Sequence, residues 1–382
     1  MKHLLKINKK ILHIILLLLI PVFFIELIYG KWQNHYNLKK IGKLNIHKNI
    51  QINYQIDQLY DFKDQISVYT RDEWGLRGVS ENIKDIDILV MGGSTTDQRF
   101  ISDAYTYDQV LENEFKKNGK NINVANAGAS AHSSYAFIKY FDLWFPNVPN
   151  LNPKYYLFLI GDNDFLRFKD DLRDKLIVNN LKFSLKVFLA ERSILYQLII
   201  KIRYVLRGGK DRDINISGPV YRDFSLDEWV NKPNFNNDEF IQFSKKVNYQ
   251  NNLKNYENNL TILINKIKSL GGIPIFVTES KRRAYTFVEN KIYGIPLDNS
   301  PSPSLGNPDI NGVDYFYMMK SLHESTKDIS DKKGAIFIDL NDLEFDLRKD
   351  FWNVGHNTPT GNLKKGKYLY SKLEKIISKW KN

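Results

Sequence analysis

Four short segments of the chain hold residue types suited to acyl-transfer chemistry, and each one follows an apolar run. They read Gly92-Gly93-Ser94-Thr95, Asn126-Ala127-Gly128-Ala129-Ser130, Gly161-Asp162-Asn163-Asp164 and Asn353-Val354-Gly355-His356. A serine hydroxyl attacks an ester once a nearby imidazole takes its proton, and N–H donors then stabilise the oxyanion. In open α/β sheets, catalytic groups gather outside the carboxyl ends of the strands. The set is therefore typical of one catalytic site at a sheet edge.

Each segment also has a purely structural interpretation. Ser94 could be the N-cap of the next helix, since serine is a favoured capping residue. Gly128 could only permit a tight turn, and Asn163 with Asp164 could cap the following helix. His356 could lie in a surface loop. Only the combination of the segments favours catalysis.

Two further features of the sequence are weaker candidates. Ser130 and His132 form a second serine–histidine pair, which ranks below Ser94 because a G-x-S-x-G elbow would need glycine where His132 stands. Arg77 lies in the turn Gly75-Leu76-Arg77-Gly78, which could bring its charge to an anionic substrate. Such segments are more often simple turns.

The elements that must position these residues appear as five short apolar runs that alternate with helical patterns. The runs are Ile86–Met91, Ile122–Asn126, Tyr155–Ile160, Ile273–Thr278 and Ala335–Leu340. Helical patterns span about 105–117, 133–146, 246–269, 313–329 and 361–380. Runs this apolar are typical of parallel strands buried on both faces. The alternation predicts an α/β fold with a three-layer, doubly wound parallel sheet.

The amino terminus has the pattern of a membrane anchor. Residues 11–30 are about long enough to cross a bilayer and follow a lysine-rich leader. No small-x-small cleavage site follows, so we expect an uncleaved, single-pass signal anchor in the cell membrane. The long domain that follows is expected on the extracytoplasmic side. Glu26 lies near one end of the span and is expected to reach the interface without a functional role.

The rest of the chain divides into a stalk and a catalytic domain with an insertion. Residues 31–83 are expected to form a juxtamembrane stalk and entry segment, and residues 84–382 the catalytic domain. The gap at about 165–245 is too long for a simple crossover and predicts an inserted cap. Within it, residues 183–207 are apolar with scattered cations. They are interpreted as a helix packed on the core or, less favoured, as a basic amphipathic helix on the membrane or beside the active site. Residues 281–312 are expected to form a long surface loop.

The composition narrows the classes of function. The 382 residues are 43% apolar, enough for a sizeable core, and contain no cysteine, which excludes disulfides and cysteine nucleophiles. The net charge of +12 is spread along the chain without a nucleic-acid-binding module, so no nucleic-acid partner is expected. Neither a phosphate-binding loop nor a metal-ligand motif is present, so no cofactor and no metal are expected. The oligomeric state is not indicated by the sequence.

Taken in order, the four segments resemble the SGNH (GDSL-like) hydrolase superfamily of esterases and acyl-transfer enzymes, over roughly residues 84–382. The resemblance implies that Ser94 is the nucleophile and His356 the general base. It also implies an oxyanion hole made by the backbone N–H groups of Ser94 and Gly128 and the side-chain amide of Asn163.

Two positions depart from the superfamily pattern. Gly93 stands where an aspartate usually precedes the serine, and Asn353 stands where an aspartate usually lies three residues before the histidine. An amide can orient an imidazole but cannot stabilise imidazolium as a carboxylate does. Three explanations follow in order of preference: a Ser–His dyad oriented by Asn353 or a backbone carbonyl, an acid supplied by Asp350, or an inactive protein.

The resemblance implies a membrane-anchored serine esterase or O-acyltransferase. Its expected substrates are ester-linked acyl groups, foremost acetyl groups, of cell-surface glycans. Two alternatives are a lipid esterase and a catalytically inactive glycan-binding or assembly protein of the same fold. Hydrolysis and transfer are not distinguished by the sequence.

Overall fold

The computed structural model describes residues 9–30, 32, 44, 46–57, 59–78, 82–165, 185, 189, 192–206, 249–278, 285–289, 291–294, 312–353 and 355–377. The chain divides into two compact units. One unit comprises Met1–Asn45 and Ile177–Ile214, and the other comprises Ile46–Leu176 and Asn215–Asn382. The four segments with candidate catalytic residues all belong to the second unit.

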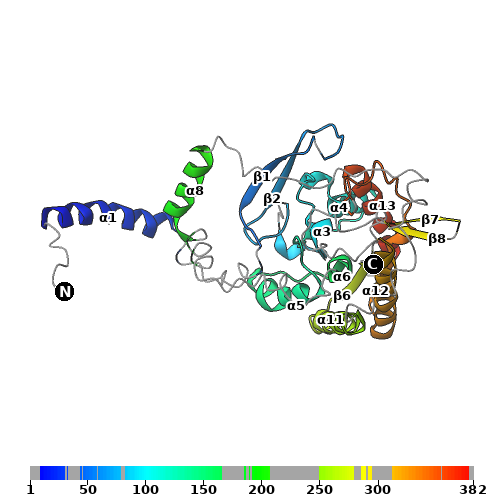
Figure 1. The fold of residues 1–382 in the computed structure, drawn as a ribbon. Helices are drawn as coiled ribbons and strands as arrows, with labels where there is room; N and C mark the ends of the chain where they lie inside the picture. The colour runs from blue at the N-terminus through cyan, green and yellow to red at the C-terminus, as the bar shows by residue number, and fades with distance from the viewer. Residues whose placement is uncertain are drawn as a thin grey trace, which may run out of the picture. The chain divides into compact units, whose positions relative to one another are not determined.

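A five-stranded parallel sheet forms the centre of the second unit (Figure 1). Its strands are β3 (Ile88–Gly92), β4 (Val124–Asn126), β5 (Tyr155–Ile160), β6 (Ile273–Thr278) and β9 (Ile336–Asp339), in the order β4-β3-β5-β6-β9. Every strand overlaps one of the predicted apolar runs. The predicted α/β fold with a doubly wound parallel sheet is thereby confirmed, and the strand order is a new finding.

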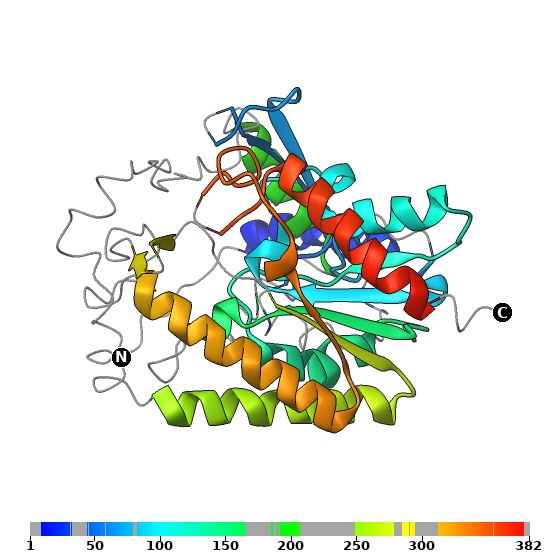
Figure 2. The same ribbon diagram turned by 90° about the vertical axis from the view of Figure 1, so that its right-hand side faces the viewer.

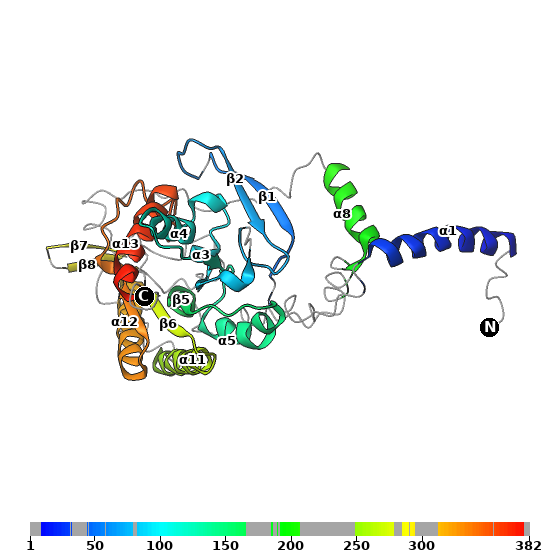
Figure 3. The ribbon, with the colours of Figure 1, turned by 180° about the vertical axis from the view of Figure 1, so that it is seen from behind.

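Helices cover both faces of this sheet and complete three layers (Figures 1 and 3). Helices α4 (Tyr107–Lys117) and α13 (Pro359–Ile377) pack together on one face. Helices α5 (Ser134–Leu143), α11 (Tyr249–Ser269) and α12 (Gly312–Lys333) cover the other. All five overlap the predicted helical patterns.

The core follows from the alternation of side chains along each strand. On one face, Ile88, Val90, Leu157 and Ile275 pack against apolar residues of α4 and α13. On the other face, the rings of Phe137, Phe158 and Phe276 lie in contact. Burying both faces explains why the strands read as continuous apolar runs.

Residues 46–78 belong to the unit that contains the sheet, although the sequence places them in a stalk. They form an antiparallel pair, β1 (Ile50–Gln55) and β2 (Ile66–Arg71), with Tyr54 and Tyr69 buried. A backbone hydrogen bond from Arg77 N–H to Asn126 O ties the end of this segment to β4. The boundary expected at residue 84 therefore does not separate a stalk from the catalytic fold.

Short elements complete the second unit. They are the helices α3 (Ser94–Asp97) and α6 (Asp162–Phe165), the hairpin β7 (Tyr285–Val288) and β8 (Lys291–Gly294), and the 3-10 turns η1 (Ile83–Asp85), η2 (Asp103–Tyr105), η3 (Phe145–Asn147) and η6 (Leu340–Asp342). The hairpin β7–β8 falls within residues 281–312, for which the sequence predicted only an irregular loop; Gly312 already begins α12. The rest of that stretch, and most of the predicted insertion at 165–245, lie outside the described residues.

The other unit contains α1 (Lys9–Tyr29) and α8 (Ile194–Leu206). Glu26 accepts hydrogen bonds from Ser193 Oγ (2.5 Å) and Leu195 N–H (3.0 Å), and so caps the first turn of α8. Glu26 therefore has a structural partner that the sequence did not predict. It also explains why α8 groups with α1 in one compact unit.

Among the helices of the described residues, none is both long enough and apolar enough to cross a bilayer. The membrane anchor expected at residues 11–30 stays a prediction.

Candidate active site

Ser94 is the first residue of α3, directly beyond the carboxyl end of β3. Gly93 occupies the N-cap position with no side chain to offer, so the capping interpretation of Ser94 is wrong. Ser94 Oγ instead lies 2.8 Å from His356 Nε2. A β-carbon at Gly93 would lie 1.8 Å from Asn163 Nδ2, so glycine is required where the Asn163 amide approaches the backbone next to Ser94.

The sheet topology explains why residues so distant in sequence meet. The connection after β3 leads to β4 on one side, whereas β5 lies on the other side of β3. A crevice opens at such a switch point, outside the carboxyl ends of the strands. Ser94 follows β3 and Asn163 follows β5, so the two residues lie at this edge of the sheet. His356 reaches it from the segment between β9 and α13.

Asn353 orients the His356 ring. Its Oδ1 accepts hydrogen bonds from Gly355 N–H (3.0 Å), His356 N–H (2.8 Å) and His356 Nδ1 (2.9 Å). Two backbone donors to one atom identify that atom as the amide oxygen, so Nδ1 must carry the ring proton. Nε2 is then the bare nitrogen that faces Ser94 Oγ. Trp352 stacks on the imidazole, with ring centroids 5.0 Å apart.

Asp350, the alternative orienting acid, has other partners. Its Oδ2 accepts from Asp346 N–H (2.6 Å) and from Lys364 Nζ (2.6 Å), and the residue is buried. Its backbone carbonyl accepts from Thr358 N–H. Asp350 therefore braces the loop that carries His356, while Asn353 holds the ring itself.

The predicted oxyanion donors are only partly placed as expected. Ser94 N–H donates to no group within the described residues, and Asn163 Nδ2 uses one hydrogen to bond His132 O (2.7 Å), which leaves the other. Gly128 N–H, however, donates to Asn126 Oδ1 (2.8 Å). The oxyanion role expected of Gly128 therefore does not fit this geometry. The reason is that Asn126 forms a side-chain turn, in which an asparagine oxygen accepts from the backbone N–H two residues ahead, so the Gly128 N–H is already occupied.

Ala131, in the loop between β4 and α5, has an unusual backbone conformation with a φ of 65°. A left-handed backbone is costly for a residue with a β-carbon. This bend lies next to His132, whose carbonyl receives the Asn163 amide. Like Ser94, Ala131 has an N–H that donates to no group in the part of the chain that the structure describes. Nothing in the sequence marks this position as special.

The second serine–histidine pair is not assembled. Ser130 is exposed, whereas His132 is buried and its Nδ1 lies 2.5 Å from Tyr140 Oη. Asp164 accepts from Ser134 N–H at the start of α5, a helix that precedes it in the chain, so this bond differs from the expected capping of the helix that follows. Asn163 does not share that role.

A buried arginine–aspartate pair behind α3 was not anticipated from the sequence. Arg71 Nη2 lies 2.7 Å from Asp97 Oδ1 and also donates to Gly128 O. Tyr69 Oη donates to the same Asp97 oxygen (2.8 Å). Burial alone would raise the pKa of Asp97, but the charges of Arg71, Arg99 and Arg77 outweigh it and lower that pKa. A strand of the supposed stalk thus holds the last residue of the nucleophile helix.

Arg77 serves the same region and not a substrate. Its guanidinium donates to the carbonyls of Asp97, Gln98 and Ile101 and pairs with Asp103 (3.1 Å). It is buried. The turn at residues 75–78 therefore fixes the backbone that follows α3.

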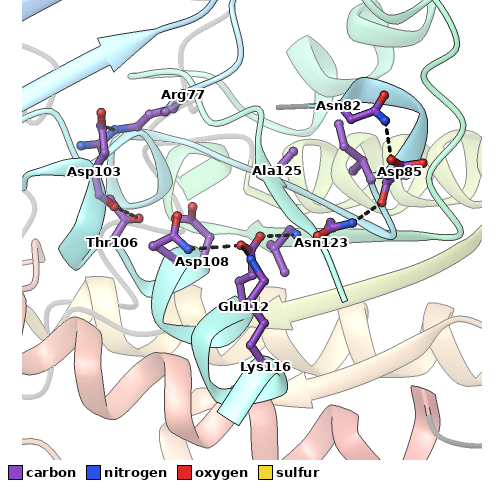
Figure 4. Close-up of a pocket in the computed structure, with 14 residues that line it drawn as sticks. Arg77, Asn82, Asp85, Asp103, Thr106, Asp108, Glu112, Lys116, Asn123 and Ala125 are labelled. Atoms are coloured by element: carbon purple, nitrogen blue, oxygen red, sulfur yellow. Dashed lines mark hydrogen bonds and ion pairs between the residues drawn. The ribbon is translucent and has the colours of Figure 1, made fainter. Parts of the chain in front are cut away.

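A cavity of about 370 Å³ lies beside Arg77, between β4 and α4, with Asp85, Asp103, Asp108 and Glu112 in its lining (Figure 4). Burial raises the pKa of Asp108 to about 6, although the Arg77 charge and the Asn126 amide oppose this. Asn126 Nδ2 donates to Asp108 Oδ1 (2.8 Å) and to Thr96 O (2.9 Å), which links the cavity wall to α3. Among the described residues, no cluster of histidine and acidic side chains is arranged to hold a metal ion.

No protein-family profile matches the chain, and no curated protein matches it. Similar solved structures include the psychrotrophic esterase EstA from Pseudoalteromonas sp., at 13% identity and a TM-score of 0.38, over 77% of this chain and 100% of that one. Others are a mutant of Axe2, an acetyl-xylooligosaccharide esterase from Geobacillus Stearmophilus (13%, TM-score 0.39, 75% and 94%), and a GDSL-like lipase from Bacteroides thetaiotaomicron (12%, TM-score 0.37, 78% and 93%). Likeness at this level supports no inference about activity, so the function is inferred from the site's own contacts.

Proposed function

We propose that this protein is a serine esterase or O-acyltransferase whose nucleophile is Ser94 and whose general base is His356. The observation that carries the proposal is the chain of contacts from Ser94 Oγ to His356 Nε2 (2.8 Å) and from His356 Nδ1 to Asn353 Oδ1 (2.9 Å). The arrangement presents a bare imidazole nitrogen to a serine hydroxyl, which is what activation of the nucleophile requires.

The reaction follows from these positions. Ser94 Oγ attacks the ester carbonyl while its proton passes to His356 Nε2. The N–H groups of Ser94 and Asn163 then stabilise the oxyanion. The imidazolium returns its proton to the departing alcohol, which leaves the acyl group on Ser94. Water or another hydroxyl then attacks this acyl-enzyme while His356 takes its proton. The imidazolium returns that proton to Ser94 Oγ as the acid or the transferred ester leaves, which restores the free serine.

As substrates we propose acyl esters, foremost acetyl esters, of cell-surface glycans, with the protein held at the extracytoplasmic face of the cell membrane. Support for the location comes from the apolar run at residues 11–30 and its lysine-rich leader. Large apolar side chains on the described part of α1 are also exposed, among them Phe23 and Ile28. Carbonate extraction of membranes tests it, since release of the full chain into the soluble fraction would refute anchoring.

The activity is tested with p-nitrophenyl acetate and the full-length protein. We expect Ser94→Ala and His356→Ala each to lower kcat/KM by at least about a thousandfold, because the two residues act as one unit. Ser130→Ala, a serine exposed on the neighbouring loop, is the matched control and should retain full activity. Undiminished hydrolysis by Ser94→Ala would refute the proposed nucleophile. An inactive wild-type protein would favour the glycan-binding or assembly alternative.

A further inference from the structure

A second pocket lies beyond the same edge of the sheet as Ser94. It has a volume of about 580 Å³ and is bordered by the hairpin β7–β8, by α12 and by the segment that follows β9. Figure 2 shows the hairpin beside the start of α12, beyond the edge where the strands end. This edge of an open α/β sheet is where ligands bind.

The strand order sets the lateral spacing between β3, which leads to Ser94, and β9, which ends at this pocket. Asp339, which lines the pocket, pairs with Thr278 of β6, and Thr278 pairs with Ile160 of β5. Strand β3, which leads to Ser94, is the next neighbour of β5. Three strand spacings of about 4.8 Å separate β3 from β9, or about 14 Å. That distance is too long for one small ester and suits an extended chain.

Aromatic rings form one side of the pocket. Phe287 and Phe316 meet edge to face with centroids 5.4 Å apart, and Tyr285 lies 5.0 Å from Phe316. Phe287 is 56% exposed. An exposed ring presents a negative face that attracts the C–H face of a sugar.

Polar groups line the same pocket. Asp339 Oδ1 accepts from Asn341 N–H (2.9 Å), which leaves Oδ2 without a donor among the described residues. Asn341 Nδ2 donates to His323 Nδ1 (2.9 Å), which fixes its amide. Lys320 and Glu324 add an exposed cation and an exposed carboxylate on α12. Rings beside separate hydrogen-bond donors and acceptors match the alternating apolar and hydroxyl surfaces of a carbohydrate.

We propose that this pocket is a carbohydrate-binding subsite that holds a glycan chain several sugars away from the acyl ester presented to Ser94. The inference rests on the proposed function, because it names the substrate as a polymeric or oligomeric glycan. The rings stack on sugar faces, and Asp339, Asn341 and Glu324 bond their hydroxyl groups. The aliphatic chain of a lipid ester would leave these polar groups unpaired.

Isothermal titration of the Ser94→Ala protein tests the subsite without turnover. The probes are chitohexaose, xylohexaose and cellohexaose. We expect at least one to bind, and Phe287→Ala in the same background to weaken that binding by about tenfold. Tyr135→Ala, which removes a partly exposed ring from α5, is the matched control and should leave binding unchanged. Absence of binding by all three probes, or equal binding by the Phe287→Ala protein, would overturn the proposal.

The proposed subsite and the proposed catalytic pair can be refuted independently of each other. Phe287→Ala in the wild-type background should hydrolyse p-nitrophenyl acetate at the normal rate. It should stay folded and melt at most roughly a few degrees lower, because the ring is 56% exposed and loses only its edge contacts with Phe316 and Tyr285. Loss of that hydrolysis would mean that Phe287 serves the fold or the reacting centre, which contradicts a distant subsite. Binding of a hexasaccharide by a protein that lacks esterase activity would keep the subsite and refute the proposed function.

Discussion

The two halves of the catalytic pair are supported in opposite ways. Behind Ser94, the four-residue helix α3 ends in Asp97, which forms a fully buried ion pair with Arg71. Around His356, the supports are a neutral amide from Asn353 and the stacked ring of Trp352, and the imidazole is only half-buried. The nucleophile helix is thus held by a buried ion pair, whereas the imidazole ring itself is held by neutral groups and the Asp350–Lys364 ion pair braces only the loop behind it.

The comparison distinguishes two tasks in the site, namely the positioning of the reacting groups and the electrostatic stabilisation of the charged imidazolium. A buried ion pair with its hydrogen bonds fixes geometry at a large desolvation cost. Removal of one partner leaves the other charge buried, which strongly lowers the stability of the fold. An amide at the histidine fixes the tautomer and the ring direction, but it adds little to the stability of the imidazolium formed during catalysis. We therefore expect changes on the serine side to alter folding first, and changes on the histidine side to alter rate first.

The largest expected effect is on the serine side. Arg71→Met removes the nearest cation from the buried carboxylate of Asp97, which keeps only the longer Arg99 contact and the Tyr69 hydrogen bond. It should lower the free energy of unfolding by about 3–5 kcal/mol in urea titrations. Arg99 pairs with the same carboxylate at 3.6 Å but is 37% exposed, so Arg99→Ala is the control and should cost about 1 kcal/mol or less. Similar losses in the two variants would contradict the comparison.

A smaller effect concerns pH. Burial raises the pKa of Asp108 to about 6 in the folded protein, from 3.8. Its contribution to stability is therefore complete below about pH 4 and is lost as the pH rises to about 6. In the wild-type protein, this group should lower the free energy of unfolding by up to about 3 kcal/mol between pH 4 and pH 7. Asp108→Asn should abolish that part of the decrease, as measured by urea unfolding at the two pH values. Burial also raises the pKa of Asp72 to about 6, so part of the slope should survive. An unchanged slope would refute the assignment.

The smallest effect is expected on the histidine side. Asn353→Asp keeps an oxygen for Gly355 N–H, His356 N–H and Nδ1, and adds the charge that stabilises imidazolium. We expect kcat/KM for p-nitrophenyl acetate to rise roughly tenfold, since a charge-assisted bond is about twice as strong as a neutral one. The acidic limb of the pH–rate profile should move to higher pH. A variant no faster than wild type would show that the amide already supplies all that the site uses.

Much of the fold and the central pair could be predicted from the sequence. Strands buried on both faces leave continuous apolar runs, as in Tyr155–Ile160, and polar residues directly after such runs mark the sheet edge. For the same reason Ser94 and Asn163 could be named as candidates, and the superfamily resemblance added His356, which the structure places 2.8 Å from Ser94.

The supports of the nucleophile could not be predicted in the same way. Strand β2 buries Ser67, Tyr69 and Arg71 on one face, so its buried face is polar and the usual alternation is hidden. The partner of Arg71 lies 26 positions away, in a helix too short to leave a periodic pattern. Gly128 was misassigned because the hydrogen bond from its N–H depends on the rotamer of Asn126, which no local sequence pattern encodes.

The most direct test of the proposed function is covalent labelling with a fluorophosphonate, followed by peptide mass spectrometry of the full-length protein. The reagent modifies a serine only where a base activates it and an oxyanion hole receives the phosphoryl oxygen. We predict a single adduct on the peptide that contains Ser94, absent from Ser94→Ala and strongly reduced in His356→Ala. An adduct on Ser130, or no adduct on the native protein under conditions that label a known serine esterase, would contradict the account.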